Sequence, residues 1–271
     1  MKPGLVARPV DASGATRTSG GPGYRRGVAD DRATSFGSIA AEYDRLRPSP
    51  SPEAIAWVVP PGCAVAVDLG AGTGLFTRAL AAAVPDVVAV EPDARMREVL
   101  VDRAPGIRAL EGTGEAIPLP DASADLVTVS SAWHWLDHER ALPEIARVLR
   151  PGGRLAVART GRDRYVEWTR EVQRLRRSVD RNRRERTHDV VLPEGSPFGP
   201  LEYAEFTTVQ RMSVDDVLAS LGTYSGAITA SDDDRAAWLT GAREVLERYF
   251  PGAAEIDVPM RSETSRTDLR R

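Results

Sequence analysis

One glycine-rich segment constrains the fold of this chain more than any other. The apolar run 65–67 leads into Asp68, and a G-x-G-x-G run at Gly70–Gly74 then precedes a helical pattern that starts at Leu75. A strand that turns sharply into a helix needs residues without a Cβ atom at the turn. The first N–H groups of such a helix have no partner within it and suit an anionic group. The segment therefore predicts a strand–loop–helix unit that brings its backbone close to a charged ligand.

A second carboxylate ends the next predicted strand. Glu91 follows the apolar run 87–90, about twenty residues after the glycine loop, where a carboxylate can accept hydrogen bonds from both hydroxyls of a ribose. Glu91 alone would suit NAD as well. Asp68 directly before the G-x-G-x-G spacing favours S-adenosyl-L-methionine (SAM) over a dinucleotide. The two segments together predict an adenosine-containing cofactor and methyl transfer.

Apolar strands and helical patterns alternate along the middle of the chain. After the first two strands, short apolar runs recur at 107–110, 125–130 and 154–158, with helical patterns or turns between them. Continuous apolar strands separated by helices are typical of a parallel sheet covered on both faces, and right-handed crossovers make such a sheet doubly wound. The predicted fold class is therefore α/β, Rossmann-like and doubly wound. Ligands of such sheets bind at the carboxyl ends of the strands.

Six blocks in chain order resemble one enzyme family. They are Phe36–Pro48, Val67–Gly74, Val90–Asp93, Gly112–Pro118, Ala132–Trp135 and Arg147–Leu155. With these blocks, residues 34–160 closely resemble class I SAM-dependent methyltransferases, in the small-molecule branch that includes quinone C-methyltransferases and trans-aconitate methyltransferase-like proteins. The resemblance implies a seven-stranded sheet, mostly parallel with its last strand antiparallel. It also implies SAM as the methyl donor and S-adenosyl-L-homocysteine as the product.

The resemblance also implies which residues contact the cofactor. Tyr43 would lie near the methionine end of SAM, and Thr113 and Gly114 near its adenine. An aspartate often stands at the position of Thr113, and because threonine accepts hydrogen bonds more weakly, backbone groups would carry more of the adenine recognition here. The full set expected at the cofactor is Tyr43, Asp68, Gly70, Ala71, Gly72, Thr73, Gly74, Glu91, Pro92, Met96, Thr113, Gly114, Glu115 and Ser130.

The segment after the fourth strand is where the transferred methyl group should point. Trp133 and Trp135 would form an aromatic wall there, since a π face attracts a sulfonium cation, and His134 would act as a general base or contact the substrate. In the alternative interpretation, the tryptophans pack a helix onto the sheet and His134 makes only structural hydrogen bonds. A base is not required, because holding a nucleophile about 3–3.5 Å from the methyl group lowers the barrier by orientation alone.

Composition limits the remaining classes of protein. The 271 residues, 42% of them hydrophobic, suit one α/β domain. A net charge of −3 does not favour binding to nucleic acid or a membrane surface. The single cysteine, Cys63, fits a reducing, cytoplasmic location, and neither a membrane-spanning run nor a Cys/His metal cluster is recognisable. We expect a monomer or homodimer that acts on a small-molecule acceptor and uses no metal.

Three segments complete the predicted domain organisation. Residues 1–33 are predicted as a disordered arm, because their glycine, proline, serine and charged residues bury too little apolar surface. Residues 34–271 would form the methyltransferase domain, with a helical cap insertion at about 162–204. The arginine-rich stretch 170–186 in that cap is a solvated helix face, a lid whose arginines meet an anionic substrate, or the docking surface of a nucleic-acid or protein methyltransferase.

Overall fold

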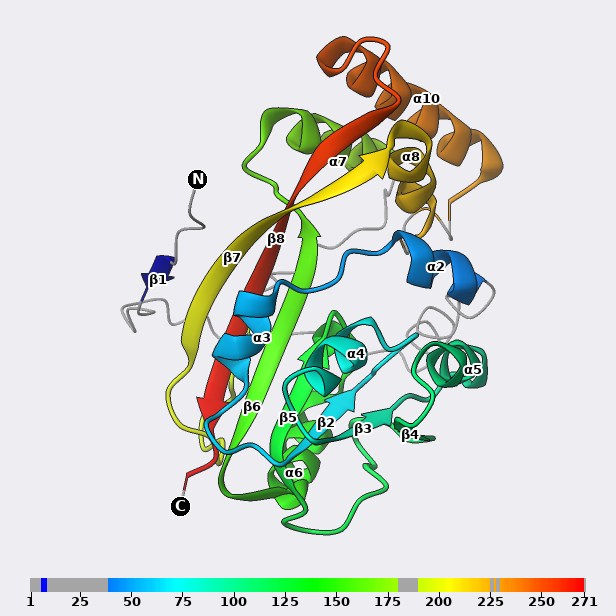
Figure 1. Ribbon diagram of the computed structural model, residues 1–271. Helices are drawn as coiled ribbons and strands as arrows, with labels where there is room; N and C mark the ends of the chain where they lie inside the picture. The colour runs from blue at the N-terminus through cyan, green and yellow to red at the C-terminus, as the bar shows by residue number, and fades with distance from the viewer. Residues whose placement is uncertain (1–5, 9–38, 180–189, 225–226, 228–229, 271) are drawn as a thin grey trace.

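One mixed β-sheet runs through the molecule (Figure 1). The computed structural model describes residues 6–8, 39–179, 190–224, 227 and 230–270. The strands are β1 (Val6–Arg8), β2 (Val65–Leu69), β3 (Asp86–Val90), β4 (Arg108–Leu110), β5 (Ala124–Ser130), β6 (Leu149–Arg162), β7 (Glu202–Ser213) and β8 (Glu255–Asp268). They lie in the order β1-β7-β8-β6-β5-β2-β3-β4.

Strand directions follow the predicted class. β2 pairs in parallel with β3 and β5, and β4 and β6 extend the parallel part on either side. The last strand, β8, is antiparallel to both of its neighbours, β6 and β7. These seven strands confirm the predicted sheet. β1 pairs with β7 at the edge, so three residues of the predicted arm form an additional strand, and the rest of that arm lies outside the described residues.

Helices cover both faces of the parallel strands. The helices, including three that lie beyond the parallel strands, are α2 (Ala40–Leu46), α3 (Pro52–Val58), α4 (Leu75–Ala81), α5 (Ala94–Arg103), α6 (His138–Val148), α7 (Glu167–Val179), α8 (Val214–Gly222) and α10 (Asp232–Tyr249). Alternate residues of β2 enter opposite core clusters: Val67 packs with α6, and Ala66 packs with α3 and α4. Because both faces are covered, the parallel strands are mostly apolar and show no regular polar alternation.

Serine residues begin two of these helices as the sequence predicts. Ser213 Oγ accepts a hydrogen bond from the N–H of Asp216 at 3.0 Å at the start of α8. Ser231 Oγ accepts one from the N–H of Asp234 at 3.2 Å at the start of α10. Each bond satisfies a backbone donor that the first helical turn leaves without a partner. Both helix starts are therefore set locally.

β6 begins earlier than the sequence predicts. The segment 150–153 is predicted as a turn before a strand, but it belongs to β6. Leu149 pairs with Ala124 and Arg154 pairs with Leu126, so four intervening residues of β6 face a single residue of β5. The predicted turn is thus a bulge in the strand, and pairing on both sides of it holds it in the sheet.

β6 also ends later than the sequence predicts. The predicted strand stops at Ala158, whereas pairing with β8 continues to Arg162, which lies opposite Met260. Four residues of β6 therefore extend past Ser130, the last residue of β5, which pairs with Ala158. At about 3.3 Å per residue, this extension carries Arg162 about 13 Å beyond the end of β5.

Three helices form a second core beyond the carboxyl ends of β6 and β7 (Figure 1). We call α7, α8 and α10 the cap helices. Trp168, Val217 and Trp238, one from each helix, are buried in one cluster with the ends of β7 and β8. The cap predicted from the sequence covers only about 162–204, a range that contains α7 but neither α8 nor α10. α8 and α10 lie in the connection between β7 and β8, and they pack on α7 through that shared core.

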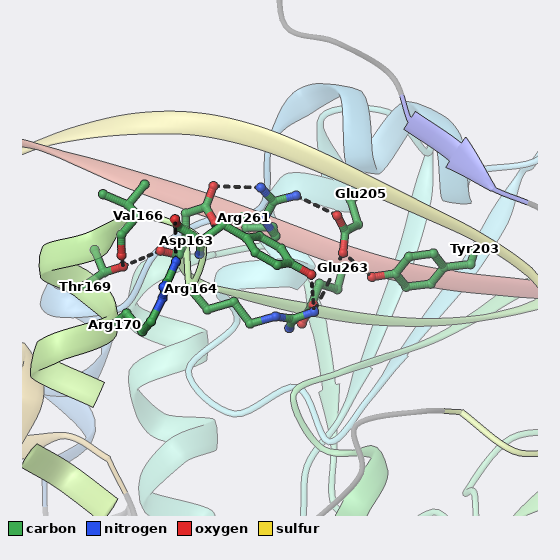
Figure 2. A network of polar contacts seen from close by, with 10 residues as sticks. Asp163, Arg164, Val166, Thr169, Arg170, Tyr203, Glu205, Arg261 and Glu263 are labelled. Carbon is green, nitrogen blue, oxygen red and sulfur yellow. Dashed lines mark hydrogen bonds and ion pairs between the residues drawn. The ribbon is translucent and has the colours of Figure 1, made fainter. Parts of the chain in front are cut away.

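A network of arginines and carboxylates fixes the start of the cap to the sheet (Figure 2). Asp163, which follows β6, accepts hydrogen bonds from Arg261 Nε at 3.0 Å and from Nη2 at 2.8 Å. Arg261 Nη1 also donates to Glu205 Oε2 at 2.6 Å. Arg164 forms an ion pair with Glu263 on β8. The turn from β6 into α7 is therefore held to both antiparallel strands by largely buried charges.

Among the described residues, no helix combines the length and the apolar character that crossing a bilayer requires.

Candidate cofactor and methyl-transfer site

The glycine loop between β2 and α4 turns sharply against the end of β3. The N–H of Gly70 donates to Val90 O at 2.8 Å, and Gly70, Gly72 and Gly74 have φ angles of +69°, +58° and +85°. A Cβ atom at Gly70 would lie 2.7 Å from Ala132 Cβ, whereas one at Gly72 would have nothing within 4 Å. All three positions need the left-handed conformation that glycine adopts readily, and Gly72 borders open space that we call the cradle.

Asp68 lies beneath this loop and does not face its open side. Its side chain is 0% exposed, and its two oxygens accept hydrogen bonds from Thr77 Oγ1 at 2.6 Å and from Thr128 Oγ1 at 3.0 Å. Burial raises the pKa of this carboxyl to about 6. The sequence left open whether Asp68 orients the loop or meets the cofactor directly. These contacts favour the first role, because they join the loop to α4 and β5.

Glu91 connects the glycine loop to the turn after β3. Glu91 Oε2 accepts a hydrogen bond from the N–H of Gly72 at 2.8 Å, and Oε1 accepts one from the N–H of Asp93 at 3.0 Å. Burial raises the pKa of Glu91. Each carboxylate oxygen can accept a second hydrogen bond, so Glu91 retains acceptor capacity at the cradle. Pro92 is exposed beside it, and Met96 is buried on α5.

A loop after β4 closes the site on the side expected for adenine. Thr113 is exposed and Gly114 is buried. A Cβ atom at Gly114 would lie 2.6 Å from Leu136 Cδ2, so a side chain at this position would require Leu136 to shift. Glu115 Oε1 accepts a hydrogen bond from the N–H of Asp137 at 2.8 Å, and this bond ties the loop to the start of α6. The geometry therefore gives Glu115 a role in holding the loop.

An ion pair holds α2 against the glycine loop. Arg78 on α4 donates from Nη1 to Thr73 O at 2.9 Å and from Nη2 to Asp44 Oδ1 at 2.8 Å. Asp44 follows Tyr43 on α2, so this bridge places the helix that carries Tyr43 beside the loop. The hydroxyl of Thr73 is buried and has no hydrogen-bond partner among the described residues. It is a polar atom that a bound cofactor can satisfy.

The chain leaves β5 in an unusual backbone conformation. Ser130 ends the strand, and Ser131 has a φ of +57°, which is uncommon for a residue with a side chain. The N–H of Ser131 donates to Ala158 O at 2.8 Å, and this bond holds the turn on β6. Ala71 lies on the neighbouring glycine loop, where its N–H donates to Val90 O at 3.1 Å. Residues in strained backbone conformations, such as Ser131, cluster at functional sites.

The structure separates the roles proposed for the aromatic segment. Trp133 is 8% exposed and belongs to the main core cluster. The ring of His138 stacks on it with a centroid distance of 4.5 Å. This packing favours the alternative interpretation, in which Trp133 packs the segment onto the sheet, and the substrate-wall role of Trp133 stays a prediction. His134 is only partly buried, with its ring 4.6 Å from that of Trp135, and it stays a candidate for the methyl-transfer side.

Sequence reasoning missed the hydroxyls that hold Asp68 and the bridge from α4 to α2. Thr128 interrupts an otherwise apolar strand, and a hydroxyl among buried residues signals a polar partner in the neighbouring strand. Thr77, which lies in the first turn of α4, gave a weaker signal. The Asp44–Arg78 pair joins two helices that are not adjacent in sequence, so the sequence held no local signal for it.

The predictions about the arginine-rich stretch and about metal binding concern segments that the structure describes only in part. Arg170 and Arg174 are exposed on α7, and residues 180–186 of the arginine-rich stretch lie outside the described residues. In the described ranges, no group of three or more His, Cys, Asp or Glu side chains is arranged to hold a metal ion.

Comparison with known proteins agrees with this geometry. The family model described as "Methyltransferase domain" matches residues 67–157. An uncharacterized methyltransferase of Mycobacterium tuberculosis is 45% identical over 185 residues, which is 68% of this chain and 71% of that protein. A malonyl-[acyl-carrier protein] O-methyltransferase of Methylococcus capsulatus is 37% identical over 144 residues, 49% of this chain and 52% of that protein.

A solved structure supports the same assignment. A protein from Anaeromyxobacter dehalogenans, provisionally named a type II methyltransferase, superimposes with a TM-score of 0.63 and 26% identity. The match covers 83% of this chain and 97% of that protein. The mixed sheet, the glycine loop and these relatives lead to one conclusion: the chain is an enzyme that belongs to the class I SAM-dependent methyltransferases.

Proposed function

We propose that this enzyme transfers a methyl group from SAM to a small-molecule acceptor. The observation that carries the proposal is the cradle at Gly72, where Glu91 joins the loop to β3 and keeps acceptor capacity. Bound SAM supplies a methyl group on a sulfonium sulfur. An acceptor nucleophile forms a bond to this methyl carbon while the carbon–sulfur electron pair returns to sulfur, giving S-adenosyl-L-homocysteine.

The protein residues act mainly by binding and orientation. Glu91 accepts hydrogen bonds from the ribose hydroxyls, and the buried Thr73 hydroxyl gains a partner when the cradle is filled. Asp68 and its two threonine partners keep the loop in one conformation. In this proposal, His134 contacts the acceptor or takes its proton. Replacement by alanine lowers kcat if His134 is the base and leaves kcat unchanged if it is not.

A small-molecule acceptor is favoured by charge and by one relative. The net charge of −3 gives no general attraction for nucleic acid. The relative from Methylococcus capsulatus is named for O-methylation of a malonyl group on an acyl-carrier protein. We propose that the cap helices cover the acceptor, since they lie beyond the carboxyl ends of β6 and β7. A cytoplasmic location and a monomeric or homodimeric state remain predictions.

Transfer of labelled methyl groups tests the proposal. The purified enzyme is incubated with methyl-labelled SAM and with separate small-molecule, protein and nucleic-acid fractions of a cell extract. We expect label in the small-molecule fraction, and a strong reduction with the Glu91→Ala variant. Label found only in nucleic acid, or only on amino-acid side chains of proteins, would contradict the proposed acceptor class and favour docking through residues 170–186.

A further inference from the structure

Two arginines meet where α2 and α8 approach the extended end of β6. Arg162, the last residue of β6, donates from Nη2 to Val217 O at 3.0 Å and also to Ser220 Oγ. Arg47, which directly follows α2, donates from Nη2 to Thr223 O at 3.1 Å. The acceptors lie along α8 and at its C-terminal end, so neutral groups of one helix hold both guanidinium groups.

Neither of these arginines has a carboxylate partner in the part of the chain that the structure describes. Both Nε atoms are buried and make no hydrogen bond within that part. Burial lowers the pKa of Arg162, and Tyr224, which hydrogen-bonds to it, and the charge of Arg47 also act on this guanidinium. Other arginines nearby are paired, as Arg45 is with Asp216 at 2.5 Å. A buried charge without a counterion lowers stability, so Arg47 and Arg162 differ from the paired arginines around them.

Two aromatic rings fix the orientation of Arg47. Its guanidinium carbon lies 4.8 Å from the ring centroid of Tyr43 and 4.2 Å from that of Tyr224. A guanidinium that lies over aromatic rings keeps its donors along its edge, and the Nε–H of Arg47 has no partner among the described residues. That edge matches the two oxygens of a carboxylate or phosphate group. The side chain is thus held in place before any anion arrives.

The arginine pair lies on the acceptor side of the proposed cofactor site. α2 packs against both α5, which follows Glu91, and α8 of the cap. The Asp44–Arg78 bridge holds the same helix on the glycine loop. Tyr43, expected near the methionine end of SAM, lies under Arg47. The pair therefore lies between the cofactor loop and the cap, where the acceptor would enter.

We propose that Arg47 and Arg162 bind an oxyanion, a carboxylate or a phosphate, on the methyl acceptor. This proposal rests on the proposed function and names the acceptor class. The exposed arginines of α7 are weaker candidates, because a charge pair in water contributes little. An anion between two partly buried guanidinium groups with buried Nε atoms gains charge-assisted hydrogen bonds. The acceptor is therefore expected to be a small acid that reaches the site between α2 and the cap.

Binding of simple anions tests this site separately from methyl transfer. Succinate and inorganic phosphate are titrated into the protein in two arms, with calorimetry and thermal unfolding as readouts. We expect at least one anion to bind and to raise Tm. In Arg47→Gln and Arg162→Gln, affinity should fall about tenfold or more, the loss expected for charge-assisted hydrogen bonds. If succinate binds more tightly, the anionic group is a carboxylate, and if inorganic phosphate binds more tightly, it is a phosphate.

The matched control is Arg45→Gln, which removes the same charge from an exposed position on α2. It should bind the anion as the wild type does. The proposal is overturned if the wild type binds neither anion, or if Arg45→Gln loses as much affinity as Arg47→Gln. If Arg162→Gln does not fold, Arg47→Gln at the end of α2 decides the outcome. Binding of S-adenosyl-L-homocysteine to the wild type without anion tests the proposed function independently.

Discussion

At the scale of single residues, Asp68 makes the stability of the glycine loop depend on pH. The pKa of this carboxyl is about 6 in the folded protein and 3.8 without burial. The folded state therefore holds this proton more tightly than the unfolded chain does. The resulting stability is fully present below pH 3.8 and is lost as the pH rises to about 6. Above that pH, the buried carboxylate costs about 3 kcal/mol.

The Asp68→Asn variant tests this linkage. The amide keeps the shape of the side chain but does not ionise, so its stability lacks this pH dependence. We expect the stability of the wild type relative to Asp68→Asn to fall between pH about 4 and about 6 and to level off above. Urea unfolding across this range measures the difference, with the exposed Glu98→Gln as a control. A difference that is constant with pH would contradict the buried-carboxylate account.

Glu91 is the residue whose loss should affect cofactor binding most directly. Glu91→Ala removes the acceptor for the N–H groups of Gly72 and Asp93 and for the proposed ribose contacts. Charge-assisted hydrogen bonds contribute about 1.5–3 kcal/mol each, so affinity for SAM should fall about tenfold or more. Calorimetry measures this loss, and Glu98→Ala on the exposed face of α5 is the control. Unchanged affinity in Glu91→Ala would remove Glu91 from the site.

At the scale of elements, two substitutions in the glycine loop should distinguish glycines needed for folding from glycines needed for cofactor binding. Gly72→Ala meets no neighbour and costs about 1–2 kcal/mol for its left-handed backbone. Gly70→Ala adds a contact at 2.7 Å with Ala132 and should destabilise more. We expect Gly72→Ala to fold but to bind S-adenosyl-L-homocysteine weakly, since its methyl group enters the cradle. Wild-type affinity in that variant would place the cofactor elsewhere.

The network at the start of α7 should contribute strongly to stability. The side chains of Asp163 and Arg261 are only 9% and 16% exposed, and removing one member of a buried pair costs about 3–5 kcal/mol. We expect Asp163→Ala to lower the free energy of unfolding by this amount in denaturant titrations. Asp257→Ala breaks a pair that is 68% and 59% exposed and should cost less than about 1 kcal/mol. Equal losses in the two variants would contradict the network's role.

At the scale of the whole molecule, the predictable parts are those with local signals. The glycine loop and the strand ending at Glu91 follow from residues close in sequence, and so do the serine caps of α8 and α10. The extension of β6 to Arg162 depends on pairing with Met260, which belongs to a strand from the far end of the chain. The cap core similarly joins α7 to helices between β7 and β8. Such pairings have no signature in a short window of sequence.

The residues of the candidate site also fall into those with a local sequence signal and those that only the fold brings together. The turn at the glycines and the contact between Glu91 and the loop follow from spacing, and the ribose contact proposed for Glu91 rests on the same spacing. The partners of Asp68 and the meeting of Arg47 with Arg162 come from segments that only the fold brings together. Trp133 shows why residue type alone does not decide a role, since an aromatic residue at a strand end suits a core as well as a substrate wall.

The most direct test of the central claim is calorimetry of the wild-type protein with SAM, S-adenosyl-L-homocysteine and NAD. A SAM-dependent methyltransferase should bind both sulfur compounds at one site with micromolar affinity and should not bind NAD. Binding of NAD without binding of either sulfur compound would contradict the account and show that the glycine loop serves a dinucleotide.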